Sequence, residues 1–279
     1  MNAQLYPWII AALAVLVAAS SGLAALSQPA APPAPGTDED AAVLLLRLQS
    51  DITTALEAMD GRLAHAAVDL GETDLNDTAA RGILSNLSGT HPSIVDCTAS
   101  DANGTILAAE PAAYHGVEGA DLRHQPNVRH ILATKRPIMS EVIAVAEGFP
   151  AAIISAPIFT NENRFVGFSS LVFRPEILIA GIAGPAANGT PYQVMVVGTD
   201  GGVIYDTDPA QIGKMTFEDP LYADYPDLLD VARRVAGERY GTAAYGFAAD
   251  GGEAVQKEIS WTTAGLHGVE WRVAVITEI

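Results

Sequence analysis

The segment DLRHQPNVRHILAT, residues 121–134, holds the densest group of side chains that could do chemistry. Arg123 and Arg129 both lie in it, and guanidinium groups bind carboxylates and other anions through charge-assisted hydrogen bonds. A solvated helix face would have the same composition, so both interpretations stay open at this level. His124 and His130 are six residues apart, and this spacing does not stack two imidazoles on one helix face for zinc.

Catalytic motifs are missing from the rest of the sequence. GFSSL lacks the G-x-S-x-G pattern of a nucleophile elbow, and Ser169 and Ser170 lie within a strand pattern. No glycine-rich phosphate loop occurs. Asp206 and Asp208 resemble the start of a calcium loop, but the required glycine and the closing glutamate are missing. The sequence therefore predicts a protein that is not an enzyme and that uses no cofactor or metal.

A second polar set lies in the last third of the chain. Its tyrosines and lysines fall at alternating positions of strand-like runs, which is typical of a half-exposed sheet face. The set comprises Tyr205, Asp206, Asp208, Lys214, Tyr222, Tyr240, Tyr245 and Lys257.

Composition excludes several classes of protein. The 279 residues are 49% hydrophobic and 17% charged, so the chain can bury a large core. The net charge of −18 repels phosphate backbones, and we expect no nucleic-acid partner. The one cysteine, Cys97, lies in the apolar run SIVDCTA with no base beside it, so it is predicted to be a buried core residue.

Residues 1–27 are predicted to be a transmembrane anchor or a signal peptide. No charged residue precedes Asp38, and the apolar run Trp8–Leu26 would span about 28 Å as a helix, close to one bilayer core. Cleavage near Ser27 would instead release a secreted protein. The Pro/Ala-rich stretch 28–39 indicates a linker, which fits poorly with a third interpretation, a buried core helix. Both of the first two alternatives place the remaining chain outside the cytoplasm.

Four of the eight asparagines lie in N-x-S/T sequons, which would suit an exported glycoprotein. Two of the four are also Asn-Gly pairs, which are common in tight turns, so glycosylation stays open. The four are Asn76, Asn86, Asn103 and Asn188.

Residues 38–70 are predicted to form one long helix, within a spine segment assigned to 40–75. Apolar residues recur every three or four positions on one face. From Ile52 onward the spacing alternates between four and three, as in a coiled coil. The helix could pack on its own domains or form a homodimer, and both stay open. The apolar stripe is Leu45, Leu48, Ile52, Leu56, Met59, Leu63, Ala66 and Leu70.

The chain repeats one pattern at an offset of 98 residues. DANGTILAAEPAAYHG, residues 101–116, is similar to TDGGVIYDTDPAQIG, residues 199–213. In each copy a strand, a turn and a second strand precede a helical region and three further strands. This order predicts a duplicated module. The matching residues are Gly104, Ile106, Pro111 and Ala112 with Gly202, Ile204, Pro209 and Ala210, and Gly116 with Gly213 after one deletion.

In this order of elements the chain resembles the double Cache domains, the extracytoplasmic sensor modules of prokaryotic chemoreceptors and histidine kinases. The resemblance rests on the long helix, the repeated D-x-x-G-x-I turns, ATKRPIMSEV, SAPIF…RFVGFSSLVF and WTTAGLHGVEWRVAV. It implies an α+β fold in which a long N-terminal helix precedes two PAS-like modules, each an antiparallel sheet of about five strands with flanking helices. The membrane-distal module is assigned to residues 76–178 and the membrane-proximal module to 179–279, with 175–190 connecting them.

The resemblance further implies a small-molecule site in the membrane-distal module, between the sheet and the helix-and-loop region before the third strand. The Arg-x-Trp-Tyr motif and the strand aspartate of members that bind amino acids are missing at the matching positions. A carboxylate or other anionic metabolite is therefore predicted in place of an amino acid. The residues assigned to the site are Tyr114, Arg123, His124, Gln125, Asn127, Arg129, Ser140, Glu141 and Ser155.

The predicted function is extracytoplasmic sensing of a small molecule by a protein held at the membrane through its N-terminal helix. No kinase, methyl-accepting or cyclase module follows in the sequence, so we expect a receptor or binding subunit that passes its state to a signalling membrane protein. The alternative is a structural or adhesive surface protein that uses the same fold without a ligand. Polar side chains in a closed cavity would favour the sensor, and an apolar filling would favour the alternative.

Overall fold

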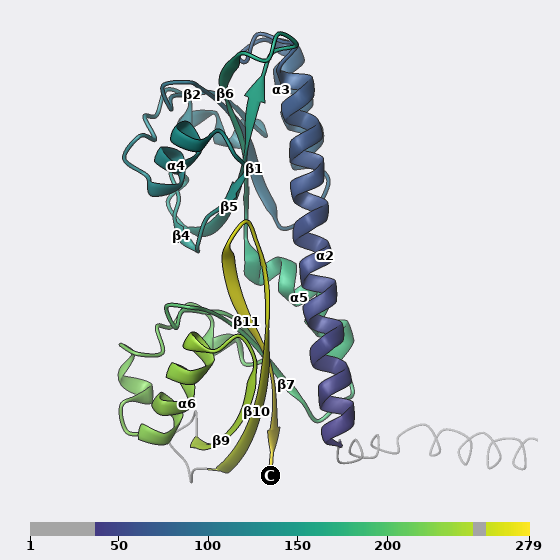
Figure 1. The fold of residues 1–279 in the computed structure, drawn as a ribbon, viewed down its shortest axis with the longest axis vertical. Helices are drawn as coiled ribbons and strands as arrows, with labels where there is room; N and C mark the ends of the chain where they lie inside the picture. The colour runs from purple at the N-terminus through teal and green to yellow at the C-terminus, as the bar shows by residue number, and fades with distance from the viewer. Residues whose placement is uncertain (1–36, 248–254) are drawn as a thin grey trace, which may run out of the picture. The chain divides into compact units, whose positions relative to one another are not determined.

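The computed structural model describes residues 37–247 and 255–279 (Figure 1). Pro35–Ile279 forms a compact unit with its own core. The predicted anchor or signal peptide, most of the linker and the turn ADGGE lie outside the described residues. Within the described ranges, no helix combines the length and the apolar character needed to cross a bilayer.

Helix α2, Asp38–Leu70, confirms the predicted long helix. Its N-terminus has a capping box: the hydroxyl of Thr37 accepts a hydrogen bond from the backbone N–H of Asp40 at 3.2 Å, and the Asp40 carboxylate accepts one from the N–H of Thr37 at 3.3 Å. Every residue of the predicted apolar stripe is buried. Because the stripe packs in one core with strands of both sheets, α2 acts as a spine for its own chain.

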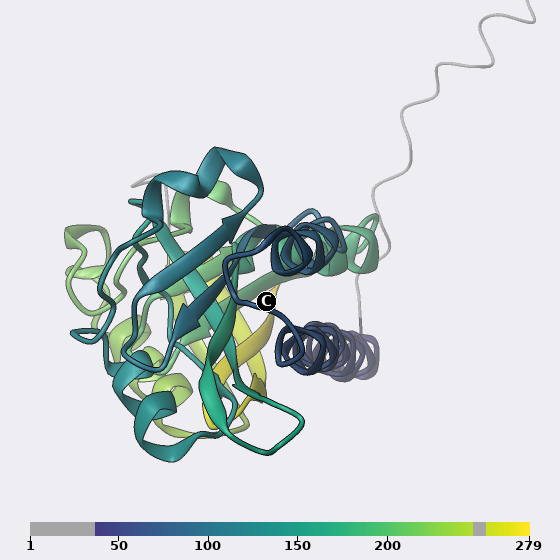
Figure 2. The ribbon, with the colours of Figure 1, turned by 90° about the horizontal axis from the view of Figure 1, so that it is seen from above.

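The first module is built on a six-stranded antiparallel sheet in the order β2-β1-β6-β5-β3, with β4 paired to β5. Helices α2 and α3 lie on one face of this sheet and α4 lies on the opposite face (Figures 1 and 2). The elements are α3 Thr78–Ser88, β1 Ile94–Asp101, β2 Ile106–Glu110, the 3-10 helix η2 Ala112–Val117, α4 Pro126–Thr134, β3 Ile138–Met139, β4 Ile143–Ala144, β5 Pro150–Phe159 and β6 Phe165–Phe173.

The second module repeats this plan with a five-stranded sheet in the order β8-β7-β11-β10-β9. Helix α2 covers one face, and α6 lies on the other (Figure 1). The elements are α5 Pro175–Ala187, β7 Gln193–Gly198, β8 Val203–Asp206, η3 Pro209–Gln211, η4 Pro220–Tyr222, α6 Pro226–Gly237, β9 Gly241–Phe247, β10 Val255–Leu266 and β11 Val269–Glu278. The predicted fold class, with one long helix and two antiparallel sheets, is confirmed.

Three predicted elements differ in detail from the structure. The expected helical region 121–134 becomes a helix only at Pro126, whose fixed φ suits the first helical position. The expected strand IMSEVIAVA is broken between β3 and β4, because the hydroxyl of Ser140 accepts the hydrogen bond from the N–H of Ile153 at 3.0 Å. The expected connector is mostly the helix α5.

The structure confirms the repeat but moves its register by one residue. Gly104 and Gly201 both have φ above +80° and both donate a backbone hydrogen bond to the residue three positions earlier, so the offset here is 97. Gly213 corresponds to Gly119 rather than Gly116, because the N–H of each donates to the carbonyl at the start of the second strand, Val203 and Ile106 respectively. The sequence comparison aligned Gly104 with Gly202. The left-handed backbone conformation that the turn requires shows that the equivalent of Gly104 is Gly201.

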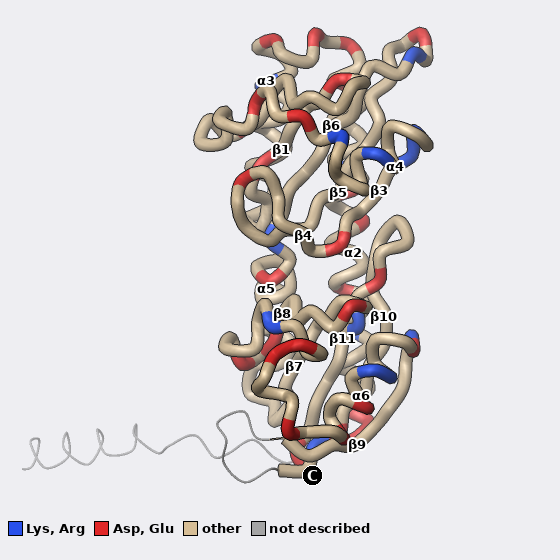
Figure 3. Tube along the Cα trace, turned by 90° about the vertical axis from the view of Figure 1, so that its left-hand side faces the viewer, with Lys and Arg blue, Asp and Glu red and all other residues tan. Residues whose placement is uncertain are grey.

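One apolar core joins α2 to both sheets. Cys97 lies in it and is fully buried, as predicted. The rings of Phe173 and Trp271, from β6 and β11, lie 6.4 Å apart between their centroids and continue the core from one sheet to the other. Outside the core, Asp and Glu are spread along the whole described chain, consistent with the net charge of −18 (Figure 3).

We predict that Leu56→Ala lowers the free energy of unfolding by about 2–5 kcal/mol, because Leu56 is fully buried on α2 and its truncation leaves a cavity. Leu46→Ala is the matched control, since Leu46 lies on the same helix but is 62% exposed. Its change is expected to stay within about 0.5 kcal/mol. Urea unfolding measures both values, and equal losses for the two variants would contradict the spine role of the buried stripe.

Candidate functional site

The side chains of strand β1 alternate between the two faces of the first sheet. Cys97 and Ala99 point toward the core around α2, as the alternation of a strand requires. Asp96, Thr98 and Ser100 therefore lie on the opposite face, under α4, and all three are buried. Three polar side chains at every second position of an otherwise apolar strand give this face the character of a binding site rather than of a core.

A small cavity of about 20 Å³ lies over this face, and we refer to it as the first cavity. Its floor comes from β1, β5 and β6, and its roof from the start of α4 and the turn after β4. No Lys, Arg or His is found among the described residues that line it. The lining residues are Thr98, Ile106, Leu122, Gln125, Asn127, Val128, Val145, Ala146, Glu147, Ile153, Ser170 and Val172.

Buried acceptor atoms without partners are concentrated around the first cavity. Among the described residues, no hydrogen bond reaches the hydroxyl of Ser100 or the side-chain oxygens of Gln125 and Asn127. The carboxyl of Asp96 has no donor from the described chain, and its one neighbour within hydrogen-bond reach is the carboxylate of Glu147. Buried polar groups in folded proteins nearly always have partners, because an unpaired one costs about 1–3 kcal/mol. Gln125 and Asn127 line the first cavity, whereas Asp96 and Ser100 lie beside its lining, so a guest with several hydrogen-bond donors could reach all of them only if the cavity widened.

The charge of this site is negative. Burial raises the pKa of Asp96 to about 8, and the nearby carboxylate of Glu147 adds to the effect by electrostatic repulsion. Asp96 is consequently protonated at neutral pH in the protein alone. A cation placed between Asp96 and Glu147 would reverse this, since it favours the ionised carboxylates.

The structure brings two of the residues assigned to the site from the sequence, Gln125 and Asn127, to the first cavity. Ser155 is buried beside it and shares a hydrogen bond of 2.8 Å with Ser170, which lines the cavity. Ser140 is also buried, but its hydroxyl is used by the backbone of Glu141 and Ile153.

The other assigned residues do not line the first cavity. Tyr114 packs in the apolar cluster with Ile106 and Phe168. Arg123 forms a two-pronged ion pair with Asp121, with nitrogen–oxygen distances of 2.9 and 2.6 Å, and it is exposed.

The remaining three are His124, Arg129 and Glu141. The guanidinium of Arg129 donates to the carbonyl oxygen of His124 at 3.0 Å on the outside of the loop before α4. Glu141 lines a separate cavity of about 410 Å³ together with residues of the turn between β7 and β8. The arginines that predicted an anionic ligand therefore brace a loop.

Sequence reasoning missed Asp96, Ser100, Glu147 and Ser170. The signal for the β1 residues was present in SIVDCTASD, where Asp, Thr and Ser recur with the period of two of a strand. Glu147 gave no such signal, because it lies in a turn and reaches the site only through the tertiary fold.

Comparison with known proteins identifies similar sensor domains. Residues 54–175 match the family model for the sensor domain of histidine kinase, guanylate cyclase and chemotaxis proteins. No curated protein sequence matches the chain significantly. An extracellular ligand-binding receptor from Desulfohalobium retbaense is 27% identical, with a TM-score of 0.73 over 86% of this chain, and the match covers 41% of the receptor's chain.

Two chemoreceptor domains share the fold at lower identity. The ligand-binding domain of PctB from Pseudomonas aeruginosa, solved with L-Gln, is 15% identical, with a TM-score of 0.59 over 87% of this chain and 91% of its own. That of CtaA from Pseudomonas fluorescens, solved with L-alanine, is 18% identical, with a TM-score of 0.60 over 86% of this chain and 97% of its own. The described chain has a double Cache sensor fold. The matched family model describes a sensor domain, and the Desulfohalobium protein is an extracellular ligand-binding receptor. Neither match is to a catalytic domain.

We predict that Asp96→Asn makes the protein more stable at pH 8 and less sensitive to pH. The folded protein holds the Asp96 proton to about pH 8, whereas the ordinary pKa is 3.8, so wild-type stability should fall as pH rises between these values. The variant loses this slope, and its melting temperature at pH 8 should exceed that of the wild type by roughly 5 °C. Thermal unfolding from pH 5 to pH 9 measures the difference.

Asp121→Asn is the matched control, because Asp121 is exposed and Arg123 holds the pKa of its carboxyl at about 2. This change should not stabilise the protein at pH 8. Asp206, whose pKa burial raises to about 6, contributes its own slope below that pH. A slope between pH 7 and pH 8 that survives Asp96→Asn would show that another group causes it.

Proposed function

We propose that the chain is the extracellular ligand-binding part of a sensor whose first module recognises a small metabolite through its ammonium group. The observation that carries this proposal is the group of unpaired buried acceptors around Asp96. An ammonium group has three donors and a positive charge, so it complements both the acceptors and the two carboxylates of Asp96 and Glu147.

The proposed ligand differs in charge from the anion that the sequence predicted. That expectation depended on Arg123 and Arg129, and neither lines the first cavity. An anion placed there would face Asp96 and Glu147 with no cation from the described lining to offset the repulsion. A simple amine fits better than a free carboxylate.

The relatives support a ligand of this kind. PctB was solved with L-Gln and with L-Arg, and CtaA with L-alanine, and all three ligands carry an ammonium group. The five polar residues among those that line the first cavity also argue against the structural or adhesive alternative, for which an apolar filling was expected. In this proposal the ligand is an amine that the first module holds by its ammonium end.

Binding would require movement, because a volume of about 20 Å³ holds no more than a water-sized guest. Opening would displace α4 or the turn that carries Glu147, and both lie on one face of the sheet. The other face of β1 packs against α2 through Cys97 and Ala99. A shift of the sheet would therefore pass to α2, and through it to the proposed membrane anchor and a signalling partner.

The test is calorimetric titration of the full chain with 3-methylbutan-1-amine and a panel of small amines. We predict binding whose affinity rises between pH 6 and pH 8, because the ligand binds the ionised form of Asp96 and releases its proton. Repeating the titration in buffers of different ionisation enthalpy counts this proton. Asp96→Asn should weaken binding at least tenfold, a change of about 1.4 kcal/mol.

Asp121→Asn again serves as the control and should bind the amines like the wild type. Amine binding without proton release and with full affinity in Asp96→Asn would place the site elsewhere. Binding of carboxylates in preference to amines would restore the anion prediction.

A further inference from the structure

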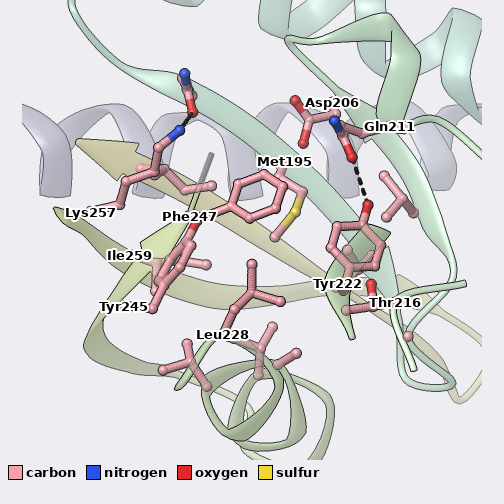
Figure 4. A pocket seen from close by; sticks show the side chains of 18 of the residues that line it. Met195, Asp206, Gln211, Thr216, Tyr222, Leu228, Tyr245, Phe247, Lys257 and Ile259 are labelled. Atoms are coloured by element: carbon pink, nitrogen blue, oxygen red, sulfur yellow. Dashed lines mark hydrogen bonds between the residues drawn. The ribbon is translucent and has the colours of Figure 1, made fainter. Parts of the chain in front are cut away.

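The second module has its own cavity, of about 130 Å³, on the face of the sheet opposite α2 (Figure 4). We refer to it as the second cavity. Strands β7, β10 and β11 form its floor, α6 forms one wall, and the segment from β8 to η4 forms the other. Its volume is slightly below the roughly 150 Å³ of an engineered cavity that binds benzene, so a guest larger than benzene would have to widen it.

The second cavity occupies the position of the first cavity in the repeat. The strand pairing and the turn hydrogen bonds relate five lining residues of one cavity to five of the other. The chain thus places a cavity at the same point of the fold twice. The equivalent residues are Thr98 and Met195, Ile106 and Val203, Leu122 and Thr216, Ile153 and Ile259, and Val172 and Ile276.

The chemistry of the two cavities differs. Where β1 presents Asp96, Thr98 and Ser100, β7 presents Gln193, Met195 and Val197. The side chains of α6 that line the cavity are also apolar, so most of the cavity wall is hydrophobic. The apolar lining residues are Met195, Val197, Val203, Leu228, Val231, Val235, Phe247, Ile259 and Ile276.

Three charged side chains line the second cavity, Asp206, Asp208 and Lys257, and the Asp208 carboxylate already accepts hydrogen bonds from the Ala210 N–H and the Gln211 amide. Asp206 and Lys257 are both labelled in Figure 4. The side chain of Lys257 is 11% exposed, and its ammonium donates to the side-chain oxygen of Gln193 at 3.0 Å. The carboxylate of Glu278 is 4.0 Å away and is itself exposed. Lys257 therefore keeps donors for a further acceptor inside the cavity.

Asp206 complements this lysine. Its Oδ1 accepts the backbone N–H of Asp208 at 2.8 Å, and Oδ2 has no partner in the described chain. Burial raises the pKa of Asp206 to about 6, and the charge of Lys257 opposes that rise. The carboxylate is ionised at neutral pH and would gain from a cationic donor.

Tyr222, Gln211 and Asp208 at this edge already have partners. The hydroxyl of Tyr222 donates to the side-chain oxygen of Gln211 at 2.6 Å, and the amide nitrogen of Gln211 donates to Asp208 at 2.9 Å (Figure 4). These bonds hold one wall in place. They leave Asp206 and Lys257 as the charged pair that a ligand would meet.

We propose that the second cavity binds an α-amino acid with an apolar side chain. The ammonium of the ligand contacts Asp206, its carboxylate contacts Lys257, and its side chain fills the space between the sheet and α6. A zwitterion satisfies both charges, whereas an amine leaves Lys257 and a fatty acid leaves Asp206 without a partner. The second module thus recognises a ligand class different from that of the first.

The test uses the full chain with three probes that share one branched alkyl group: L-leucine, 3-methylbutan-1-amine and 4-methylpentanoate. We expect L-leucine to bind at least tenfold more weakly to Lys257→Met and to Asp206→Asn than to the wild type. Ala232→Phe, which fills the α6 wall of the cavity, should weaken L-leucine to a similar extent. Lys135→Met is the control, since Lys135 lies in the first module near the ring of Phe165.

Measuring the affinity of each variant for each probe distinguishes the two sites. Asp96→Asn should leave L-leucine affinity unchanged, and Lys257→Met should leave 3-methylbutan-1-amine affinity unchanged. Failure of L-leucine to bind the wild type, or full affinity in both Lys257→Met and Ala232→Phe, would overturn the second site without touching the first. Loss of L-leucine binding in Asp96→Asn alone would assign amino acids to the first cavity and also overturn it.

Discussion

The packing of the α2 stripe against both sheets is the constraint on which the rest of the double Cache structure depends. A helix of this length can cover one face of each sheet only if both sheets present apolar residues to it, as β1 does with Cys97 and Ala99. Strand alternation then sends the intervening side chains to the opposite face. That face is covered by shorter elements, α4 and α6, and a cavity lies under each of them.

Buried polar atoms without hydrogen-bond partners lower the stability of the first module near its cavity. Around Asp96, three side-chain oxygen atoms, those of Ser100, Gln125 and Asn127, are buried without hydrogen-bond partners in the described chain, an arrangement that a purely structural domain would avoid. The cost is tolerable because the opposite face of the same sheet belongs to the large apolar core. Local instability on one face of a stable sheet is also what allows a ligand to move α4 or the turn of Glu147.

The two modules share a backbone arrangement but differ in the side chains that face their cavities. Both turns between the first two strands use a glycine with positive φ, Gly104 and Gly201, so the register of each sheet is the same. The side chains over the sheet have diverged: Thr98 corresponds to Met195 and Ser100 to Val197. One module therefore has a small cavity with no lysine or arginine among its described lining residues, and the other has a larger cavity lined by both carboxylates and a lysine. Both sheets pack against α2, so the two modules share one helix.

The sequence by itself determined the elements and their order, because helical and strand periodicity are local properties. The stripe from Leu45 to Leu70, the duplicated strand–turn–strand pattern and the buried Cys97 could all be predicted from it. Only the tertiary structure decided the sites. Arg123 and Arg129, which look like anion ligands in the sequence, are turned outward by contacts with Asp121 and His124, and Glu147 reaches Asp96 from a turn about fifty residues away. Likewise, Asp206 and Lys257 belong to different strands, and their side chains meet at one cavity only because β7 and β11 lie between β8 and β10 in the sheet.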